Sequence, residues 1–162
     1  MATSLIITAA TVFTTLTNLS GTPNSKYYYN AEYENGKVSQ ITVLNNDTYL
    51  TKKLTHRYEY DNQDRLVNKE TLAWDNAKQA WVKRQMEHYD YSDNQIEMTL
   101  SRWNAKKQQY DLAERYNYSL IQDHVIAITK EKWDKNQNNM ACAEHILMMN
   151  ASNDLAQVAI VD

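Results

Sequence analysis

The chain has 162 residues and a net charge of −3, which suits one ordinary domain. This charge excludes a general nucleic-acid-binding protein, because such a protein needs a basic face to offset phosphate charge. Hydrophobic residues make up 43% and charged residues 23% of the chain, so a folded core is expected rather than disorder. Cys142 is the one cysteine, so no internal disulfide can form.

The N-terminal segment differs from the rest of the chain. Residues 1–21 carry no charge, and residues 5–13 form an apolar run that is too short and too rich in Thr to span a membrane. We predict an export signal over residues 1–22, cleaved between Leu16 and Asn24, and one folded domain over 23–162. No Lys or Arg precedes the run, so an N-terminal strand or helix of the fold remains the alternative. Export places the protein in the periplasm, outside the cell or on the surface of a Gram-negative bacterium, with no stable membrane insertion once the signal is removed.

The composition predicts strands joined by tight turns. Gly (2) and Pro (1) are scarce, whereas Asn (17) and Tyr (12) are abundant. Asn tolerates the left-handed backbone that turns need, so it can replace Gly there.

A repeat of about 30 residues organises the chain. Trp74, Trp103 and Trp133 are each followed by Asp or Asn, a polar tip, and a large apolar residue seven positions after the Trp. A second signature of the Tyr-x-Tyr type recurs between them at residues 57–60, 88–91 and 115–118. Each period therefore holds two strands and two turns, and Asn35-Gly36 adds a strong hairpin signal.

The predicted fold is all-β, an antiparallel meander of about ten strands built from repeated hairpins. The strands are expected at 26–34, 37–45, 48–60, 65–74, 80–91, 95–103, 109–119, 124–133, 139–149 and 154–161. Residues 139–149 also fit a helix, but they fill a strand position in the repeat. Apolar residues fall on both faces of several strands, which indicates a twisted open or partly rolled sheet.

The last predicted strand has no charge between Leu155 and Val161. A free edge of that kind favours pairing with another strand, so self-association through residues 155–161 is one interaction that the sequence offers.

The segment Tyr58 to Leu66 resembles the tyrosine-aspartate repeats of bacterial surface and toxin-shell proteins. Over residues 26–150 the chain more closely resembles short secreted Bacteroidales proteins of unknown function, the domain of unknown function 3836. This resemblance implies export and a β fold. It supplies no catalytic residue, and the turns here lack the Gly usual in tyrosine-aspartate repeats.

No catalytic, metal or cofactor site is predicted. His88 and His145 occupy matching repeat positions, but equivalent positions of successive hairpins already lie two strands or about 9.6 Å apart, too far to share one metal ion, and Arg115 occupies the position between them. The aligned acids Glu87, Glu114 and Glu144 are better explained by cross-strand ion pairs. Cys142 lies among apolar residues and reads as a small apolar filler.

The recurring aromatic residues are the remaining candidate site. The simpler interpretation is that they pack across strands and stabilise the sheet. The functional interpretation is a ladder of flat rings that binds a glycan or a partner protein, formed by Trp74, Trp81, Trp103, Tyr110 and Trp133. We therefore expect a non-enzymatic exported protein with a structural or protein-interaction role, and as the alternative a carbohydrate-binding module that uses this ladder.

Overall fold

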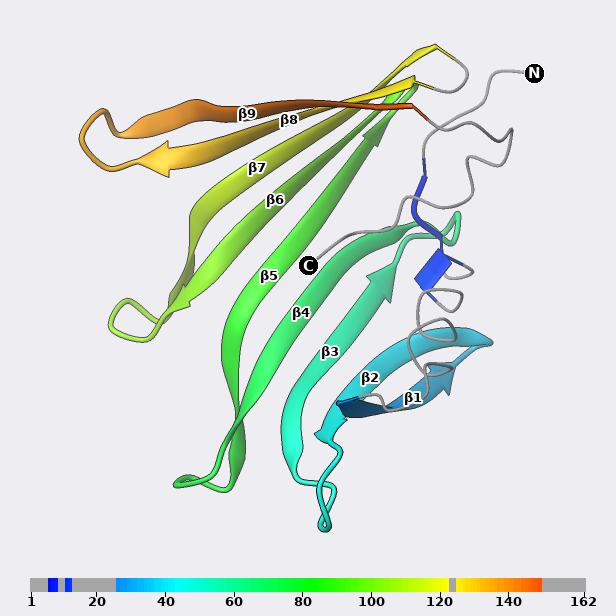
Figure 1. Cartoon of the computed structure of the whole chain (residues 1–162), viewed down its shortest axis with the longest axis vertical. Helices are drawn as coiled ribbons and strands as arrows, with labels where there is room; N and C mark the ends of the chain where they lie inside the picture. The colour runs from blue at the N-terminus through cyan, green and yellow to red at the C-terminus, as the bar shows by residue number, and fades with distance from the viewer. Residues whose placement is uncertain (1–5, 9–10, 13–25, 123–124, 150–162) are drawn as a thin grey trace. The chain divides into compact units, whose positions relative to one another are not determined.

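The computed structural model describes residues 6–8, 11–12, 26–122 and 125–149. They contain nine antiparallel strands in one meander sheet whose order follows the chain from β1 to β9 without closing (Figure 1). The strands are β1 (Tyr27–Glu34), β2 (Lys37–Asn45), β3 (Lys52–Tyr60), β4 (Leu66–Asp75), β5 (Ala80–Ser92), β6 (Gln95–Asn104), β7 (Gln109–Gln122), β8 (Val125–Asp134) and β9 (Asn139–Met149). The predicted all-β meander is confirmed, and residues 139–149 form a strand rather than a helix.

Most predicted strand boundaries agree with the structure to within one or two residues, with clear exceptions at β3 and β7. β3 begins at Lys52 and not at residue 48, because Asp47 accepts hydrogen bonds from the backbone N–H groups of Tyr49 and Thr51 and holds these residues in a turn. β7 continues to Gln122, three residues beyond the predicted end. The predicted strand 154–161 lies outside the described residues.

The chain divides into two compact units within β5, at Gln85 and Met86. In the unit of residues 7–85, the buried core includes Val38, Ile41, Val43 and Leu66. In the other unit, the buried core includes Tyr89, Ile96, Met98 and Ile126. Each unit therefore has its own buried residues on the strands that it contains.

A β-bulge occurs in every strand pair whose register is described. The extra residue is Ser39, Lys53, Val67, Ala113, Ile121 or Ala143, in chain order. A bulge reverses the face on which all later side chains of that strand lie. At Val67 the bulge puts Leu66 on the opposite face from Leu72. The bulge therefore decides which apolar residues of β4 share a face, and sequence alternation alone does not.

The three hairpin loops that follow the repeated tryptophans share one geometry. The side-chain oxygen of the residue after each Trp accepts hydrogen bonds from backbone N–H groups two and three residues later, at Asp75, Asn104 and Asp134. The residue four positions after this acceptor has a left-handed backbone, with φ of 49° at Gln79, 54° at Gln108 and 52° at Asn138. The sequence repeat is therefore a structural repeat of these loops.

Asn replaces Gly in the turns less often than the composition suggests. Among described non-Gly residues with positive φ, Asn occupies positions 35 and 138, whereas Leu50, Asp64, Gln79 and Gln108 occupy the others. A left-handed backbone is unfavourable for Leu and Gln, whereas Asp tolerates it much as Asn does. The three Trp hairpin loops share a side-chain oxygen, from Asp75, Asn104 or Asp134, that accepts hydrogen bonds from backbone N–H groups of the turn. Asp and Asn therefore act in these loops chiefly as caps.

The substitution Asp134→Ala is expected to lower the free energy of unfolding by about 1 kcal/mol. Asp134 Oδ1 accepts hydrogen bonds from Asn136 N at 2.8 Å and Gln137 N at 3.3 Å, and alanine removes both. Urea unfolding measures the loss. Lys135→Ala, at the exposed tip of the same loop, is the control and should change the stability by less than about 0.5 kcal/mol. Equal losses in the two variants would contradict the capping role.

Part of the predicted export signal contacts the fold. Ile7 and Val12 are buried, and the backbone carbonyl of Ile7 accepts a hydrogen bond from Leu66 N at 2.9 Å. Thr8 forms an isolated antiparallel bridge with Arg65. These contacts belong to the unit of residues 7–85.

Candidate functional site

Two of the predicted ladder residues, Trp74 and Trp81, lie at one hairpin in the unit of residues 7–85. Their ring centroids are 5.0 Å apart at an interplanar angle of 72°, an edge-to-face contact. Lys52 Nζ lies 4.1 Å from the centroid of Trp74. Both rings are half-buried, and the contact supplies cross-strand packing of the kind that stabilises sheets.

The other three ladder residues lie in the unit of residues 86–162. Trp103 and Tyr110 are register partners on β6 and β7, with centroids 5.0 Å apart at 66°. Trp133 on β8 pairs in register with Met140 on β9 and remains 37% exposed. The structure therefore brings together two edge-to-face pairs, and Trp133 is the most exposed ring of the five.

The tyrosines of the second signature lie on the opposite sheet face from the tryptophans. In the unit of residues 86–162, Tyr118 pairs with Ile96 and Ile128, whereas Trp103 lies seven residues after Ile96 on β6 and therefore on the other face. The rings of Tyr116 and Tyr118 stack with centroids 6.4 Å apart at 16°. Burial raises the pKa of Tyr118 to about 12. The tyrosines therefore belong to the buried face, which supports a packing role for them.

A polar row crosses the Trp-bearing face in the unit of residues 7–85. Gln40 donates to Glu32 at 2.9 Å, and Arg57 Nε donates to Gln40 at 3.3 Å. Glu70 then lies between two cations, 3.9 Å from Arg57 and 3.9 Å from Lys83. Arg57 and Lys83 thus form cross-strand ion pairs with one shared acid, Glu70.

The acids that align in the sequence lie in different surroundings. Glu87 is buried and accepts a hydrogen bond of 2.7 Å from Tyr89. Glu114 lies 3.3 Å from Arg102 and 3.4 Å from Lys130. Burial raises the pKa of Glu114, but the 2.6 Å hydrogen bond from Tyr116 and the Lys130 charge outweigh it, so this pKa is below its usual value. These contacts account for two of the three acids as parts of the sheet.

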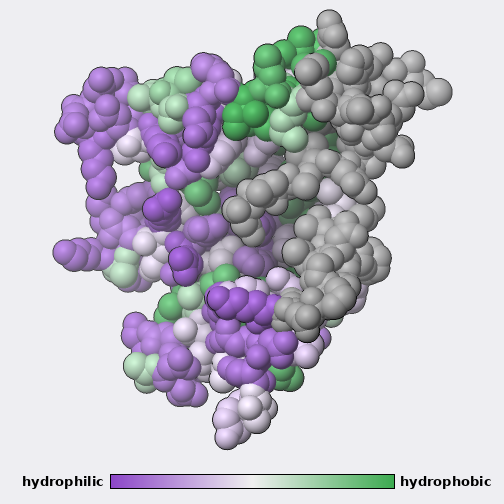
Figure 2. All heavy atoms as spheres, viewed as in Figure 1, coloured by the Kyte–Doolittle hydropathy of each residue, from purple (hydrophilic) through white to green (hydrophobic). Residues whose placement is uncertain are grey.

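Strand β9 ends the strand order among the described residues and carries an apolar run. Ile146, Leu147 and Met148 are 46%, 70% and 45% exposed. Ile146 and Met148 lie on the Tyr118 face, and Leu147 lies on the other face. Figure 2 shows hydrophobic atoms gathered near the top of the view, where the C-terminal half of β9 lies in Figure 1. Both faces of this edge strand are therefore apolar and exposed.

Cys142 is exposed on β9 and is not the apolar filler that its neighbours in sequence suggested. Its Sγ lies 3.1 Å from His145 Nε2, and His145 Nδ1 lies 3.2 Å from Thr129 Oγ1 on β8. Residues three apart on a regular strand lie on opposite faces, but the bulge at Ala143 places Cys142 and His145 on one face. The signal in the sequence was Cys-x-x-His, which the alternation pattern assigned to two faces.

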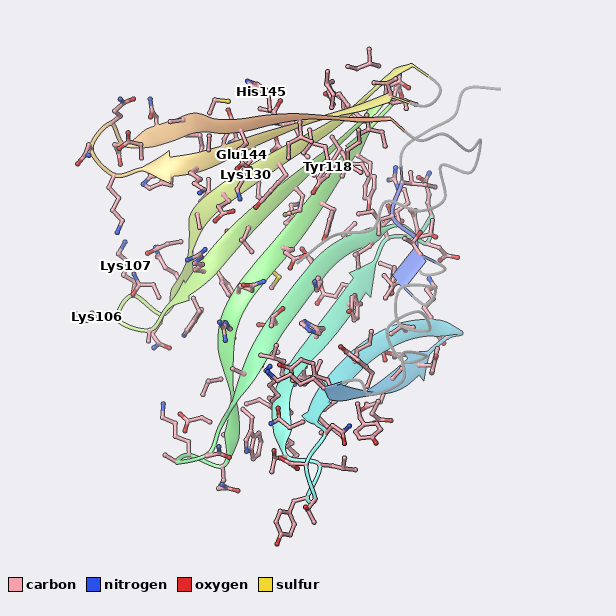
Figure 3. The ribbon with its side chains drawn as sticks, viewed as in Figure 1. Lys106, Lys107, Tyr118, Lys130, Glu144 and His145 are labelled. Carbon is pink, nitrogen blue, oxygen red and sulfur yellow. The ribbon has the colours of Figure 1, made fainter. Side chains whose placement is uncertain are left out.

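Figure 3 labels His145 on β9, with Glu144 beside it and Lys130 on the neighbouring β8. Lys130 and Glu144 are register partners, on the face opposite Cys142 and His145. No three His, Cys, Asp or Glu side chains of the described residues gather closely enough to hold a metal ion. Within the same residues, no helix has the length and apolar character needed to cross a membrane.

Comparison with solved structures gives the same fold in Bacteroidetes proteins. A protein with unknown function from Bacteroides fragilis NCTC 9343 is 21% identical, with a TM-score of 0.67 over 75% of this chain and 91% of that one. A DUF3836 family protein from Bacteroides vulgatus ATCC 8482 is 31% identical, with a TM-score of 0.52 over 54% of this chain and 90% of that one. A DUF3836 family protein from Parabacteroides distasonis ATCC 8503 is 26% identical, with a TM-score of 0.51 over 56% and 85%.

No curated protein matches the chain. The model of one family, described as a family of unknown function, matches residues 1–119, well over half of the sequence. The chain therefore belongs to the family of unknown function DUF3836.

Proposed function

We propose that this chain is a non-enzymatic exported protein-interaction module, and that its partner binds along edge strand β9. The observation that carries the proposal is the exposed run Ile146, Leu147 and Met148 at the end of the strand order. An edge strand presents backbone N–H and C=O groups that pair with an added strand, and its alternate side chains select that strand.

The contrast with β1 supports this role for β9. Soluble proteins protect edge strands with charged side chains, Pro or bulges. β1, at the other end of the strand order, carries exposed Glu32 and Glu34. From Ile146 to Met149, β9 carries no charge and no Pro. β1 also has an uncharged run at Tyr27–Ala31, and β9 carries Glu144, so the difference between the edges lies in the exposed aliphatic side chains that β9 presents at Ile146, Leu147 and Met148.

The partner that fits this edge is a second copy of the chain. Two β9 strands can pair antiparallel about a two-fold axis through Leu147, which is the commonest symmetry of protein dimers. Glu144, the one carboxylate of β9, then lies three positions from the axis in each copy and opposes no carboxylate. Like charges directly opposed would destabilise the pair, so this register is free of that cost.

The substitution Leu147→Lys is expected to convert the associated protein to monomer, as measured by sedimentation velocity over a range of concentrations. Because Leu147 is 70% exposed, the change should alter the folding stability by less than about 0.5 kcal/mol. The matched control is Tyr28→Lys on β1, which is also exposed and should leave association unchanged. A wild-type protein that stays monomeric at every concentration contradicts the proposal. Loss of association in Val158→Lys but not in Leu147→Lys would move the interface to residues 155–161.

The proposal that the protein is exported is supported by the uncharged segment at residues 1–21, which contains an apolar run. Intact mass of the protein recovered from the exported fraction of the cell tests this part. We expect a chain that begins between residues 17 and 25, having lost the contacts of Ile7 and Val12 with the fold. A full-length chain in that fraction, or its absence from it, would favour residues 1–22 as an element of the fold.

A glycan-binding role is the second candidate, favoured by the exposed ring of Trp133. The edge-to-face pairs direct the other rings toward each other, which reduces the flat surface available for a sugar. Titration of Trp fluorescence against a glycan panel decides this candidate, with Trp133→Phe as the matched variant. A spectral shift that Trp133→Phe abolishes would support glycan binding, and no shift with any glycan would remove it.

A further inference from the structure

We propose that Cys142, His145 and Thr129 form a reactive-thiol site that undergoes exchange with low-molecular-weight disulfides outside the chain. This site is distinct from the β9 pairing described above, and neither proposal requires the other. It rests on the geometry of three side chains on neighbouring strands, two of them brought to one face by a bulge.

The thiol of Cys142 and the imidazole of His145 are in direct contact. Cys142 Sγ lies 3.1 Å from His145 Nε2, which is within hydrogen-bond distance for sulfur. A thiolate is the nucleophile in disulfide exchange, and a neighbouring imidazolium stabilises it. The exposed position of Cys142 leaves its sulfur accessible to a small disulfide.

Thr129 on the neighbouring strand orients the imidazole of His145. Thr129 is the register partner of His145, and its Oγ1 lies 3.2 Å from Nδ1. When Nδ1–H donates to Thr129, Nε2 is the acceptor that faces the thiol. A nucleophile, a base and a group that orients the base are the parts that activated cysteines share. Cys142 and His145 thus act together, with Thr129 as a positioning residue.

The surrounding charges come from β7 and β8. Glu131, the register partner of Cys142, lies on the same face as the thiol. Its carboxylate is 3.3 Å from Arg115 NH1 on β7, and Arg115 Nε also lies 3.7 Å from Glu97. The Arg115 charge therefore offsets the Glu131 carboxylate that would otherwise oppose a thiolate at Cys142.

The reaction balances without a further oxidant. The Cys142 proton passes to His145 Nε2, and the thiolate attacks one sulfur of the disulfide. A new S–S bond joins Cys142 to that sulfur as the original S–S bond breaks, and the departing thiolate takes the proton from His145. Cys142 is oxidised and the departing sulfur is reduced. The product is one mixed disulfide per chain, a stoichiometric modification.

The experiment measures the second-order rate of the thiol with an aromatic disulfide reagent and with oxidised glutathione, across about pH 5 to 9. Folded wild-type protein at about pH 7 is expected to react about ten-fold faster than the same chain in concentrated guanidinium chloride, where the contact is lost. His145→Gln should remove this advantage, because the variant lacks the imidazole nitrogen that faces the thiol. Thr129→Val should reduce the rate by a smaller factor.

The matched control is His88→Gln, because His88 is also exposed on a strand and lies 3.4 Å from Asp90. This variant should react like the wild type. Intact mass should show one added glutathione per chain, lost in Cys142→Ser. A folded wild-type rate no greater than that of the unfolded chain, or an unchanged rate in His145→Gln, would overturn the proposal. Because these measurements use dilute protein, they remain valid whether or not β9 pairs with a second copy.

Discussion

Replacement of Tyr89 by alanine is expected to lower the free energy of unfolding by about 3–5 kcal/mol. Tyr89 is 1% exposed and is among the largest fully buried side chains described, so alanine leaves a cavity in the unit of residues 86–162. Its hydroxyl also donates a 2.7 Å hydrogen bond to the buried carboxylate of Glu87. Urea unfolding followed by far-ultraviolet circular dichroism measures the loss.

Two further variants separate the causes of this loss. Tyr89→Phe keeps the ring but removes the hydroxyl donor beside Glu87, and should cost about 1–3 kcal/mol. Tyr28→Ala removes a tyrosine that is 51% exposed, and should cost less than about 1 kcal/mol. If Tyr89→Ala were no more damaging than Tyr28→Ala, the buried face assigned to the Tyr-x-Tyr signature would be wrong.

Stability is also expected to fall steeply between about pH 10 and pH 12, with Tyr118 contributing about 3 kcal/mol of the fall. Burial raises the pKa of Tyr118 to about 12, from an ordinary value of 10.0. Below pH 10 the phenol is neutral in both the folded and the unfolded chain, so its contribution is fully present. Above pH 10 the unfolded chain ionises first, and the contribution is lost as the pH rises through 12.

Urea unfolding at several alkaline pH values measures this effect, and phenolate absorbance reports the ionisation. Burial also raises the pKa of Tyr60 to about 12, and burial raises the pKa of Tyr89 well above its ordinary value. The free energy of unfolding of Tyr118→Phe should therefore still decrease steeply at alkaline pH, but the decrease should be smaller than in the wild type by about 3 kcal/mol. An identical pH dependence in the wild type and Tyr118→Phe would show that Tyr118 is not buried in solution.

Much of the sheet could be predicted from the sequence because the hairpin loops recur. Trp74, Trp103 and Trp133 each precede an oxygen-bearing residue that caps its loop, so the two strands of each repeat are fixed by local chemistry. The beginning of β3 could not be placed as well. Thr48, Tyr49 and Leu50 favour a strand by composition, but Asp47 caps the backbone of this segment into a turn.

The side-chain faces were less predictable, because strand alternation holds only between bulges. A bulge adds one residue to one strand and depends on tertiary packing, so the sequence pattern does not reveal it. The bulge at Ala143 brings Cys142 and His145 together, and the bulge at Val67 separates Leu66 from Leu72. Of the predicted ring ladder, the sequence correctly indicated the recurring Trp positions but not the edge-to-face pairing.

The most direct test of the proposed interaction is amide hydrogen exchange at Ile146, Leu147 and Met148 in dilute and concentrated full-length protein. Alternate N–H groups of β9 already face β8, so pairing between two copies predicts that the amides of this segment that point away from β8 exchange more slowly at high concentration. The amides of β1 should show no such change, and Leu147→Lys should abolish the effect on β9. Exchange on β9 that is independent of concentration would contradict self-association through this strand.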